Sequence, residues 1–163
     1  MPFRIRVSLA ILLALSLLLL IGPFLVPVSE LEDTTEARAL ASDYSRFTEV
    51  PGVEIHYRDE GSGEPVYLLL HGYPANLASW RHVIPELALT GRVVAFDRPG
   101  FGLSERPEQG SWPRNANPYS PAAQVTQAVA LLDELGIEQA IWVGSSSGAL
   151  TALEAAAAHP ERV

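Results

Sequence analysis

The stretch Ile141–Leu150, IWVGSSSGAL, places three serines between two glycines, after an apolar run and before a run of small residues. Residues 140–144 are typical of a buried strand, and the alanine-rich residues from Ser147 onward are typical of a helix. Ser146 alone has a glycine two positions before it and another two positions after it. This G-x-S-x-G spacing suits a sharp strand-to-helix turn, where side chains at the two flanking positions would collide with the turn or the neighbouring strand.

A serine in this position has two interpretations. It is either a helix N-cap that follows a strand, or a nucleophile at the edge of a sheet, where open α/β sheets place their sites. The second interpretation gains support because strand, turn and helix occur in the required order. Ser146 is then the predicted nucleophile and Ser145 fills the turn. Ser147 lies at the helix N-terminus, from which its backbone N–H can donate to an oxyanion.

The surrounding residues predict an α/β fold. Residues 53–57 alternate like a half-buried strand, while 65–70 and 92–96 are continuously apolar, like strands covered on both faces. Helical patterns occur at 80–89, which Pro85 shortens or kinks, and at 121–135, which Ser120 caps. The alternation predicts a mostly parallel sheet with flanking helices, preceded by an antiparallel hairpin over residues 47–70.

The loop after residues 65–70 carries a second group of candidate residues, His71-Gly72-Tyr73. An oxyanion hole with two donors takes its second N–H from the loop after this strand, and Tyr73 is the candidate. Gly72 would let the loop approach the elbow closely. His71 ends an inner strand early in the chain, so we interpret it as a structural residue rather than as the catalytic base.

Four segments, LLLHGYP, AFDRPGFGLSERP, VGSSSGAL and AAHPERV, occur in an order and at spacings that resemble the α/β-hydrolase superfamily. Within it they are similar to the group of serine hydrolases, epoxide hydrolases and dehalogenases, from Phe47 to Val163. The resemblance implies an α/β-hydrolase fold, with Ser146 as the nucleophile and the N–H groups of Tyr73 and Ser147 as the oxyanion hole. For Asp97 it implies a structural role in the D-x-P-G-x-G-x-S loop.

The resemblance also bears on the reaction. In this group a carboxylate nucleophile accompanies dehalogenase and epoxide hydrolase chemistry, so a serine at position 146 implies hydrolysis of an ester, thioester or similar acyl bond. Carbon–carbon bond hydrolysis and perhydrolysis are alternatives. Relatives usually carry a bulky residue or histidine at position 145 and a bulky residue at 147. Serines at both positions give this chain a smaller and more polar elbow.

The acid and base of a catalytic triad are missing from the expected places. The order in this fold is serine, acid, histidine, and only Glu154, His159 and Glu161 follow Ser146. His159 would lie roughly 20 Å from Ser146 along the helix, too far to act as its base. We therefore expect a C-terminally truncated hydrolase fragment, inactive by itself. The alternative is a non-catalytic relative that binds a small ligand or a partner at the oxyanion pocket.

The N-terminus forms a separate piece. Residues 7–28 contain no charged side chain, while Arg4 and Arg6 precede them. This pattern predicts a transmembrane signal anchor, with a cleaved signal peptide as the alternative. By the positive-inside rule, the catalytic domain would lie on the extracytoplasmic side, or be secreted or periplasmic after cleavage. Residues 29–46 read as an acidic linker, partly helical around 34–42, before the hydrolase portion at 47–163.

Composition excludes several classes of function. The formal net charge of the 163 residues is −8, which argues against binding to nucleic acid because such binding rests on phosphate neutralisation. The chain has no cysteine, which excludes disulfides, cysteine nucleophiles and thiolate metal sites. No metal or cofactor is implied. The expected ligand is a small-molecule acyl substrate, and the expected membrane contact is through residues 7–28.

Overall fold

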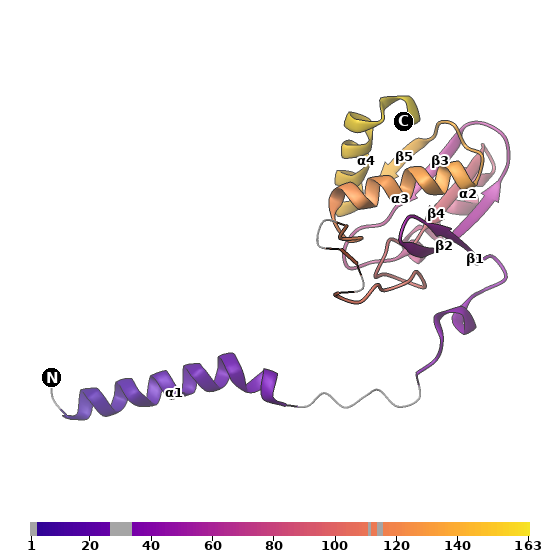
Figure 1. The fold of residues 1–163 in the computed structure, drawn as a ribbon. Coiled ribbons are helices and arrows are strands. Elements are labelled where there is room, and N and C mark those ends of the chain that lie inside the picture. The colour runs from indigo at the N-terminus through magenta and orange to yellow at the C-terminus, as the bar shows by residue number, and fades with distance from the viewer. Residues whose placement is uncertain (1–2, 27–33, 111, 114–115) are drawn as a thin grey trace. The chain divides into compact units, whose positions relative to one another are not determined.

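The computed structural model describes residues 3–26, 34–110, 112–113 and 116–163, and the side chains of residues 3–6 and 9–10 lie outside this description. Two compact units, Met1–Thr34 and Thr35–Val163, are described separately (Figure 1). The domain limits predicted at residues 28 and 46 are finer than this division and stay predictions. Residues 27–33, which include the end of the predicted anchor and the start of the linker, lie outside the described residues.

The first unit contains one long helix, α1, over Phe3–Leu25. Its helical conformation agrees with the apolar pattern of the segment. Among the residues that the structure describes, however, no helix is long and apolar enough to cross a membrane. The prediction of a transmembrane or signal helix is therefore not supported by the structure. The side chains of Arg4 and Arg6, on which the predicted orientation rests, lie outside the described part.

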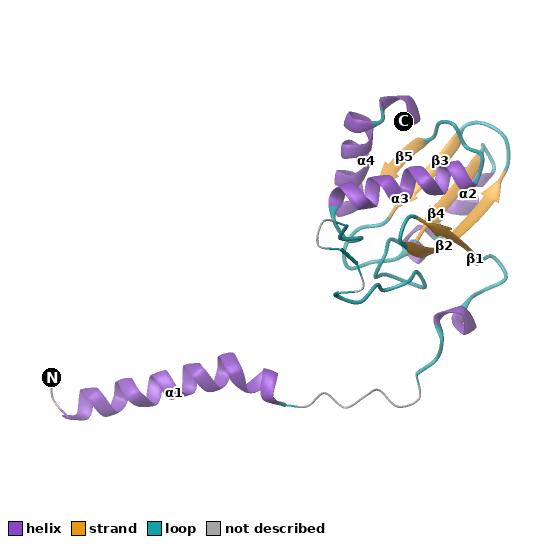
Figure 2. Ribbon diagram, in the orientation of Figure 1, coloured by secondary structure: helices purple, strands orange, loops and turns teal. Residues whose placement is uncertain are grey.

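The second unit is built on a five-stranded sheet with helices on both faces (Figure 2). A short 3₁₀ helix, η1, over Ala37–Leu40 precedes the sheet, within the stretch expected to be partly helical. In spatial order the strands are β1 (Arg46–Val50), β2 (Val53–Gly61), β4 (Arg92–Phe96), β3 (Val66–Leu70) and β5 (Ile141–Gly144).

The sheet is mixed: β3, β4 and β5 are parallel as predicted, and the prediction of a mostly parallel sheet is wrong for β2, which is antiparallel to both of its neighbours. β1 with β2 and β2 with β4 are antiparallel pairs, while β3 pairs in parallel with both β4 and β5. The predicted hairpin over residues 47–70 is also wrong, because the hairpin is β1–β2 and β4 lies between β2 and β3. The alternating pattern shows which face of a strand is buried, but it does not show which strand lies beside it.

The helices follow the sequence signals closely. Pro85 lies in the first turn of a short helix, α2 (Ile84–Ala88), which follows a 3₁₀ turn, η2 (Leu77–Trp80). Ser120 caps α3 (Pro121–Glu134), because its Oγ accepts a hydrogen bond from the Ala123 N–H at 3.2 Å. The remaining elements are α4 (Ser147–Ala158) and a final 3₁₀ turn, η3 (Pro160–Arg162).

The core lies on both faces of the central strands. Leu68 and Leu70 of β3 belong to one cluster, which includes residues of α3, and Leu69 belongs to the other, which includes Ile84 of α2. All three β3 leucines are fully buried, which stabilises the fold by about 1.5–3 kcal/mol for each side chain. β5 is less buried than predicted, and Ile141 is 48% exposed, because β5 forms the edge of the sheet.

Candidate active site

The turn between β5 and α4 has the backbone geometry expected of a nucleophile elbow. Ser146 has φ 51° and ψ −119°, and it is the one non-glycine residue with positive φ among the described residues. Such a conformation costs about 1–3 kcal/mol and persists only where the surrounding structure enforces it. Ser146 is also exposed to solvent. The turn thus presents one strained serine at the carboxyl edge of the parallel strands.

The two flanking glycines are required by close packing. A Cβ atom on Gly148 would lie 2.3 Å from the carbonyl oxygen of Leu70, and one on Gly144 would lie 2.4 Å from the backbone nitrogen of Ala149. Both distances are far below van der Waals contact. The steric reason for the G-x-S-x-G spacing is therefore confirmed: one glycine lets the helix pack on β3, and the other lets the turn close.

The loop after β3 lies directly against this turn. A Cβ atom on Gly72 would lie 3.0 Å from both the Ser146 Cβ and the Ser145 carbonyl oxygen, so the close approach expected of Gly72 is confirmed. Tyr73 follows on the same loop and is 72% exposed. Among the described residues, the backbone N–H groups of Tyr73 and Ser147 have no hydrogen-bond acceptor. Two free donors thus lie beside or within the elbow, as a site for an oxyanion requires.

His71 is a structural residue, as expected. It is fully buried, and its Nε2 accepts a hydrogen bond from the Arg98 N–H at 3.0 Å. Its Nδ1 lies 2.8 Å from the Gly72 carbonyl oxygen, to which it donates. Burial lowers the pKa of His71 below its usual value, so the neutral ring is favoured. With both nitrogens engaged, this ring holds the loop after β3 in place and is not available to Ser146.

Asp97 is likewise committed to structure. It is buried, and its Oδ1 accepts the Leu77 N–H at 2.7 Å, while its Oδ2 accepts the Leu103 N–H at 2.9 Å. The same Oδ2 lies 2.7 Å from His56 Nδ1. These three contacts tie together the loops that follow β3 and β4. The structural role implied for Asp97 therefore fits its surroundings, which do not include Ser146.

The contact with His56 completes a group that the sequence analysis missed. His56 Nε2 lies 2.8 Å from Ser45 Oγ, so serine, histidine and aspartate are linked in the order of a catalytic triad. Ser45 Oγ also accepts the Ser42 N–H at 3.0 Å. The one sequence signal was a histidine within the alternating residues 53–57. In the structure His56 is 4% exposed.

No acid or base reaches Ser146 among the described residues. His159 lies at the C-terminal end of α4, the opposite end from Ser146, with Glu161 3.5 Å away. Glu154 is exposed along the same helix. The expectation that these residues do not serve Ser146 is in accord with their positions. The described residues also contain no group of three or more metal-ligating side chains that could hold a metal ion.

One further side chain reaches the elbow from the loop after β4. Arg98 is only 4% exposed, and its guanidinium donates to Ser147 Oγ at 2.8 Å and to Gln124 Oε1 at 2.7 Å. Burial lowers the pKa of Arg98 from its usual value. The sequence analysis did not single out this residue, since an arginine in a loop is most often solvated.

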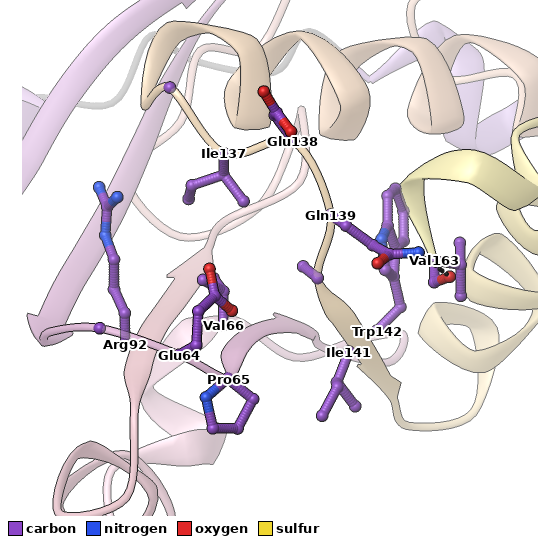
Figure 3. A pocket seen from close by; sticks show the side chains of 13 residues that line it. Glu64, Pro65, Val66, Arg92, Ile137, Glu138, Gln139, Ile141, Trp142 and Val163 are labelled. Carbon is purple, nitrogen blue, oxygen red and sulfur yellow. Dashed lines mark hydrogen bonds between the residues drawn. The ribbon is translucent and has the colours of Figure 1, made fainter.

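A large cavity of about 950 Å³ opens at the opposite end of the parallel strands from the elbow (Figure 3). It lies at the amino ends of β3, β4 and β5, whereas the elbow lies at their carboxyl ends. Arg92 on its wall is paired with Asp59, with 2.8 Å between Nη2 and Oδ2. The cavity therefore has no part in the chemistry of Ser146. It is lined by Gly63, Glu64, Pro65, Val66, Arg92, Gly136, Ile137, Glu138, Gln139, Ala140, Ile141, Trp142 and Val163.

Comparisons with known proteins agree with this arrangement. A family profile described as alpha/beta hydrolase fold matches residues 65–163. The 2-hydroxymuconate semialdehyde hydrolase of Pseudomonas sp. (strain CF600) is 43% identical over 115 residues, which cover 69% of this chain and 38% of that protein. Epoxide hydrolase A of Mycobacterium tuberculosis is 38% identical over 120 residues, which cover 72% of this chain and 35% of that protein.

Solved structures lead to the same group. The crystal structure of epoxide hydrolase VrEH1 from Vigna radiata matches with a TM-score of 0.66 and 37% identity, over 73% of this chain and 35% of that one. The mixed sheet and the strained serine turn after β5 are the architecture of an α/β hydrolase. The chain belongs to the α/β-hydrolase fold family. It spans a little over a third of the length of the relatives it matches.

Proposed function

We propose that the protein is a serine hydrolase that cleaves an ester or similar acyl bond of a small molecule through Ser146. The observation that carries this proposal is the backbone of Ser146, held at φ 51° in an exposed turn between β5 and α4. Backbone strain at a single exposed polar residue is typical of functional sites. The hydrolase names of the relatives support the same general class of reaction.

In the proposed reaction, Ser146 Oγ bonds to the acyl carbon and the carbonyl π electrons move onto the oxygen. The free N–H groups of Tyr73 and Ser147 donate hydrogen bonds to this oxyanion, and the N-terminus of α4 adds its positive partial charge. Collapse of the tetrahedral species breaks the bond to the leaving oxygen, which takes up the proton that the Ser146 hydroxyl has lost and departs as the alcohol. An acyl-serine remains, which water then hydrolyses. A serine rather than a carboxylate at position 146 favours acyl transfer over epoxide opening.

The reaction also needs a base at the Ser146 hydroxyl, and the described residues place none there. The buried rings of His56 and His71 are engaged with Asp97, Ser45 and the chain around Gly72. This observation favours a second candidate function, a non-catalytic protein that binds a small ligand at the oxyanion donors. The chain spans a little over a third of the length of the relatives it matches. The experiments that compare the two candidates therefore use the full product of the gene.

A fluorophosphonate probe separates the two candidates. The probe reacts with an activated serine, forming an Oγ–P bond as fluoride leaves. We expect the full gene product to be labelled and its Ser146→Ala variant to remain unlabelled, as measured by in-gel fluorescence. Equal labelling of both proteins would overturn the assignment of Ser146 as nucleophile. Absence of labelling from both, in folded protein, would favour the non-catalytic candidate.

We also propose that residues 47–163 are exported, a proposal that rests on the charge pattern of the N-terminal segment alone. Fusion of alkaline phosphatase and of green fluorescent protein after Val163 tests it, because the first is active only outside the cytoplasm and the second fluoresces only inside. High phosphatase activity with low fluorescence is expected, and the reverse pattern would contradict it. Membrane attachment is scored separately, by carbonate extraction.

A further inference from the structure

Arg98 is a buried cation without a counterion. Its guanidinium binds two neutral oxygens, those of Ser147 and Gln124, at 2.8 and 2.7 Å. Its Nε has no hydrogen-bond partner. Within the part of the chain that the structure describes, no carboxylate lies within ion-pair distance of it. The Phe101 ring lies 5.4 Å from the Arg98 Cζ and gives a cation–π contact. No anion offsets the cost of removing this charge from water, so a purely structural reason for the residue is weak.

Arg98 touches both halves of the oxyanion site. Its side chain donates to the hydroxyl of Ser147, the residue that offers one free N–H. Its backbone N–H donates to Nε2 of His71, and the same ring donates to the Gly72 carbonyl, next to Tyr73. A single residue thereby joins the strand-to-helix turn to the loop that faces it. Movement of Arg98 would disturb both donors together.

The charge also lies where positive potential already accumulates. Ser147 is the first residue of the 12-residue α4, whose N-terminus carries a positive partial charge. Arg98 adds a full positive charge beside it, and the guanidinium is always protonated at neutral pH. The Ser147 hydroxyl supplies the oxygen through which the guanidinium binds the elbow.

We propose that Arg98 is an electrostatic positioning residue, which stabilises the negative charge that forms on the acyl oxygen when Ser146 attacks. The inference rests on the proposed function and adds to it the source of the stabilising field. Arg98 acts through Ser147 and His71 and does not itself touch the substrate. Because a buried charge is screened little by salt, its effect persists at high ionic strength.

The test uses 4-nitrophenyl acetate turnover by the full gene product. Arg98→Met keeps the unbranched apolar part of the side chain and removes the charged guanidinium, and we expect kcat to fall about 10-fold or more with KM unchanged. Arg98→Lys restores a point charge and recovers kcat to within about threefold of the wild type. Gln124→Met is the matched control: it removes the other side-chain partner, leaves the charge, and keeps kcat within about twofold.

A second readout does not depend on turnover. Benzenephosphonate is an anion with the tetrahedral shape of the intermediate, and calorimetry measures its affinity for the folded protein. We expect about 10-fold weaker binding in Arg98→Met and unchanged binding in Gln124→Met. If Arg98→Met does not fold, Ser147→Ala carries the test, with a several-fold loss of affinity expected because the bond to Arg98 is lost.

The outcomes separate this inference from the proposed function. Equal kcat and equal phosphonate affinity in Arg98→Met and the wild type would overturn the role of Arg98 while Ser146 remains the nucleophile. A parallel loss of kcat in Arg98→Met and Gln124→Met would show a packing role without an electrostatic one. Wild-type turnover by the Ser146→Ala variant would overturn the proposed function itself.

Discussion

Two serines in this protein have opposite sets of helpers. Ser146 has a strained backbone, two free N–H donors near it and a helix N-terminus, but no histidine in contact with it among the described residues. Ser45 has a histidine at 2.8 Å and, through that histidine, an aspartate. Ser45 shows none of the backbone strain of Ser146 and precedes the first strand of the sheet.

The comparison teaches that a chain of hydrogen bonds does not by itself make a nucleophile. In the Ser45–His56–Asp97 group every polar atom is used to join the start of β1, β2 and the loop after β4. Catalysis requires donors that stay free until charge develops in the transition state. At Ser146 such donors exist, and they are held there by backbone packing.

The largest expected effect concerns which serine reacts. After treatment of the full gene product with a fluorophosphonate, peptide mapping should find the phosphonyl group on Ser146 and not on Ser45. Labelling of Ser45→Ala should proceed within about twofold of the wild-type rate, whereas Ser146→Ala should lose roughly 10³-fold or more. A phosphonyl group on Ser45 would reverse the comparison, since the triad-like contacts would then be the reactive ones.

Next in size is the effect of closing the space that Gly148 leaves open. In Gly148→Ala the new methyl group would overlap the Leu70 carbonyl, and we expect the free energy of unfolding to fall by about 3 kcal/mol. Gly110→Ala is the matched control, because Gly110 has φ 95° but no atom within 4 Å of its added Cβ. It should cost about 1 kcal/mol. Urea titration measures both, and equal costs would show that packing does not hold the elbow.

A smaller effect on the free energy of unfolding is expected from a substitution in the Ser45–His56–Asp97 group. Asp97→Asn turns one acceptor into a donor that faces the Leu103 N–H or His56, and we expect a loss of about 2 kcal/mol in the free energy of unfolding. Asp133→Asn makes the same substitution at a site whose side chain is 62% exposed, and should cost about 0.5 kcal/mol or less. Similar losses in the two variants would mean that the buried network contributes little.

The smallest effect is a pH dependence that originates at His71. Its pKa is lowered in the folded protein, so the unfolded chain binds a proton more readily. The stabilisation is complete above the usual pKa of 6.5 and is lost as the pH falls toward the lowered value. Between pH 7.5 and 5 the wild type should lose more of its free energy of unfolding than His71→Asn does. Denaturation at a series of pH values measures this, and parallel curves would contradict it.

Local features of this fold were predictable from the sequence. The elbow with its flanking Gly144, the cap at Ser120 and the shortness of the helix at Pro85 all depend on residues close together in the chain. Each follows from steric or hydrogen-bonding rules that act over a few positions.

Features that join distant segments were not predictable in the same way. The placement of β4 between β2 and β3 depends on pairing between strands, which no local pattern encodes. The contact between His56 and Asp97 spans 41 positions, and that between Arg98 and Ser147 spans 49. The half-exposure of Ile141 follows from the edge position of β5, while its apolar sequence resembled that of a central strand.

The cavity at the amino ends of the strands has a practical consequence for handling the protein. Glu138 lies on its rim and is exposed, on the edge of the sheet that faces away from Ser146. Because the 163 residues contain no cysteine, a cysteine introduced there would be their single thiol. A dye, a spin label or a solid support could be coupled at that one point with the elbow left open to solvent. The molecule thus offers separate edges for immobilisation and for chemistry.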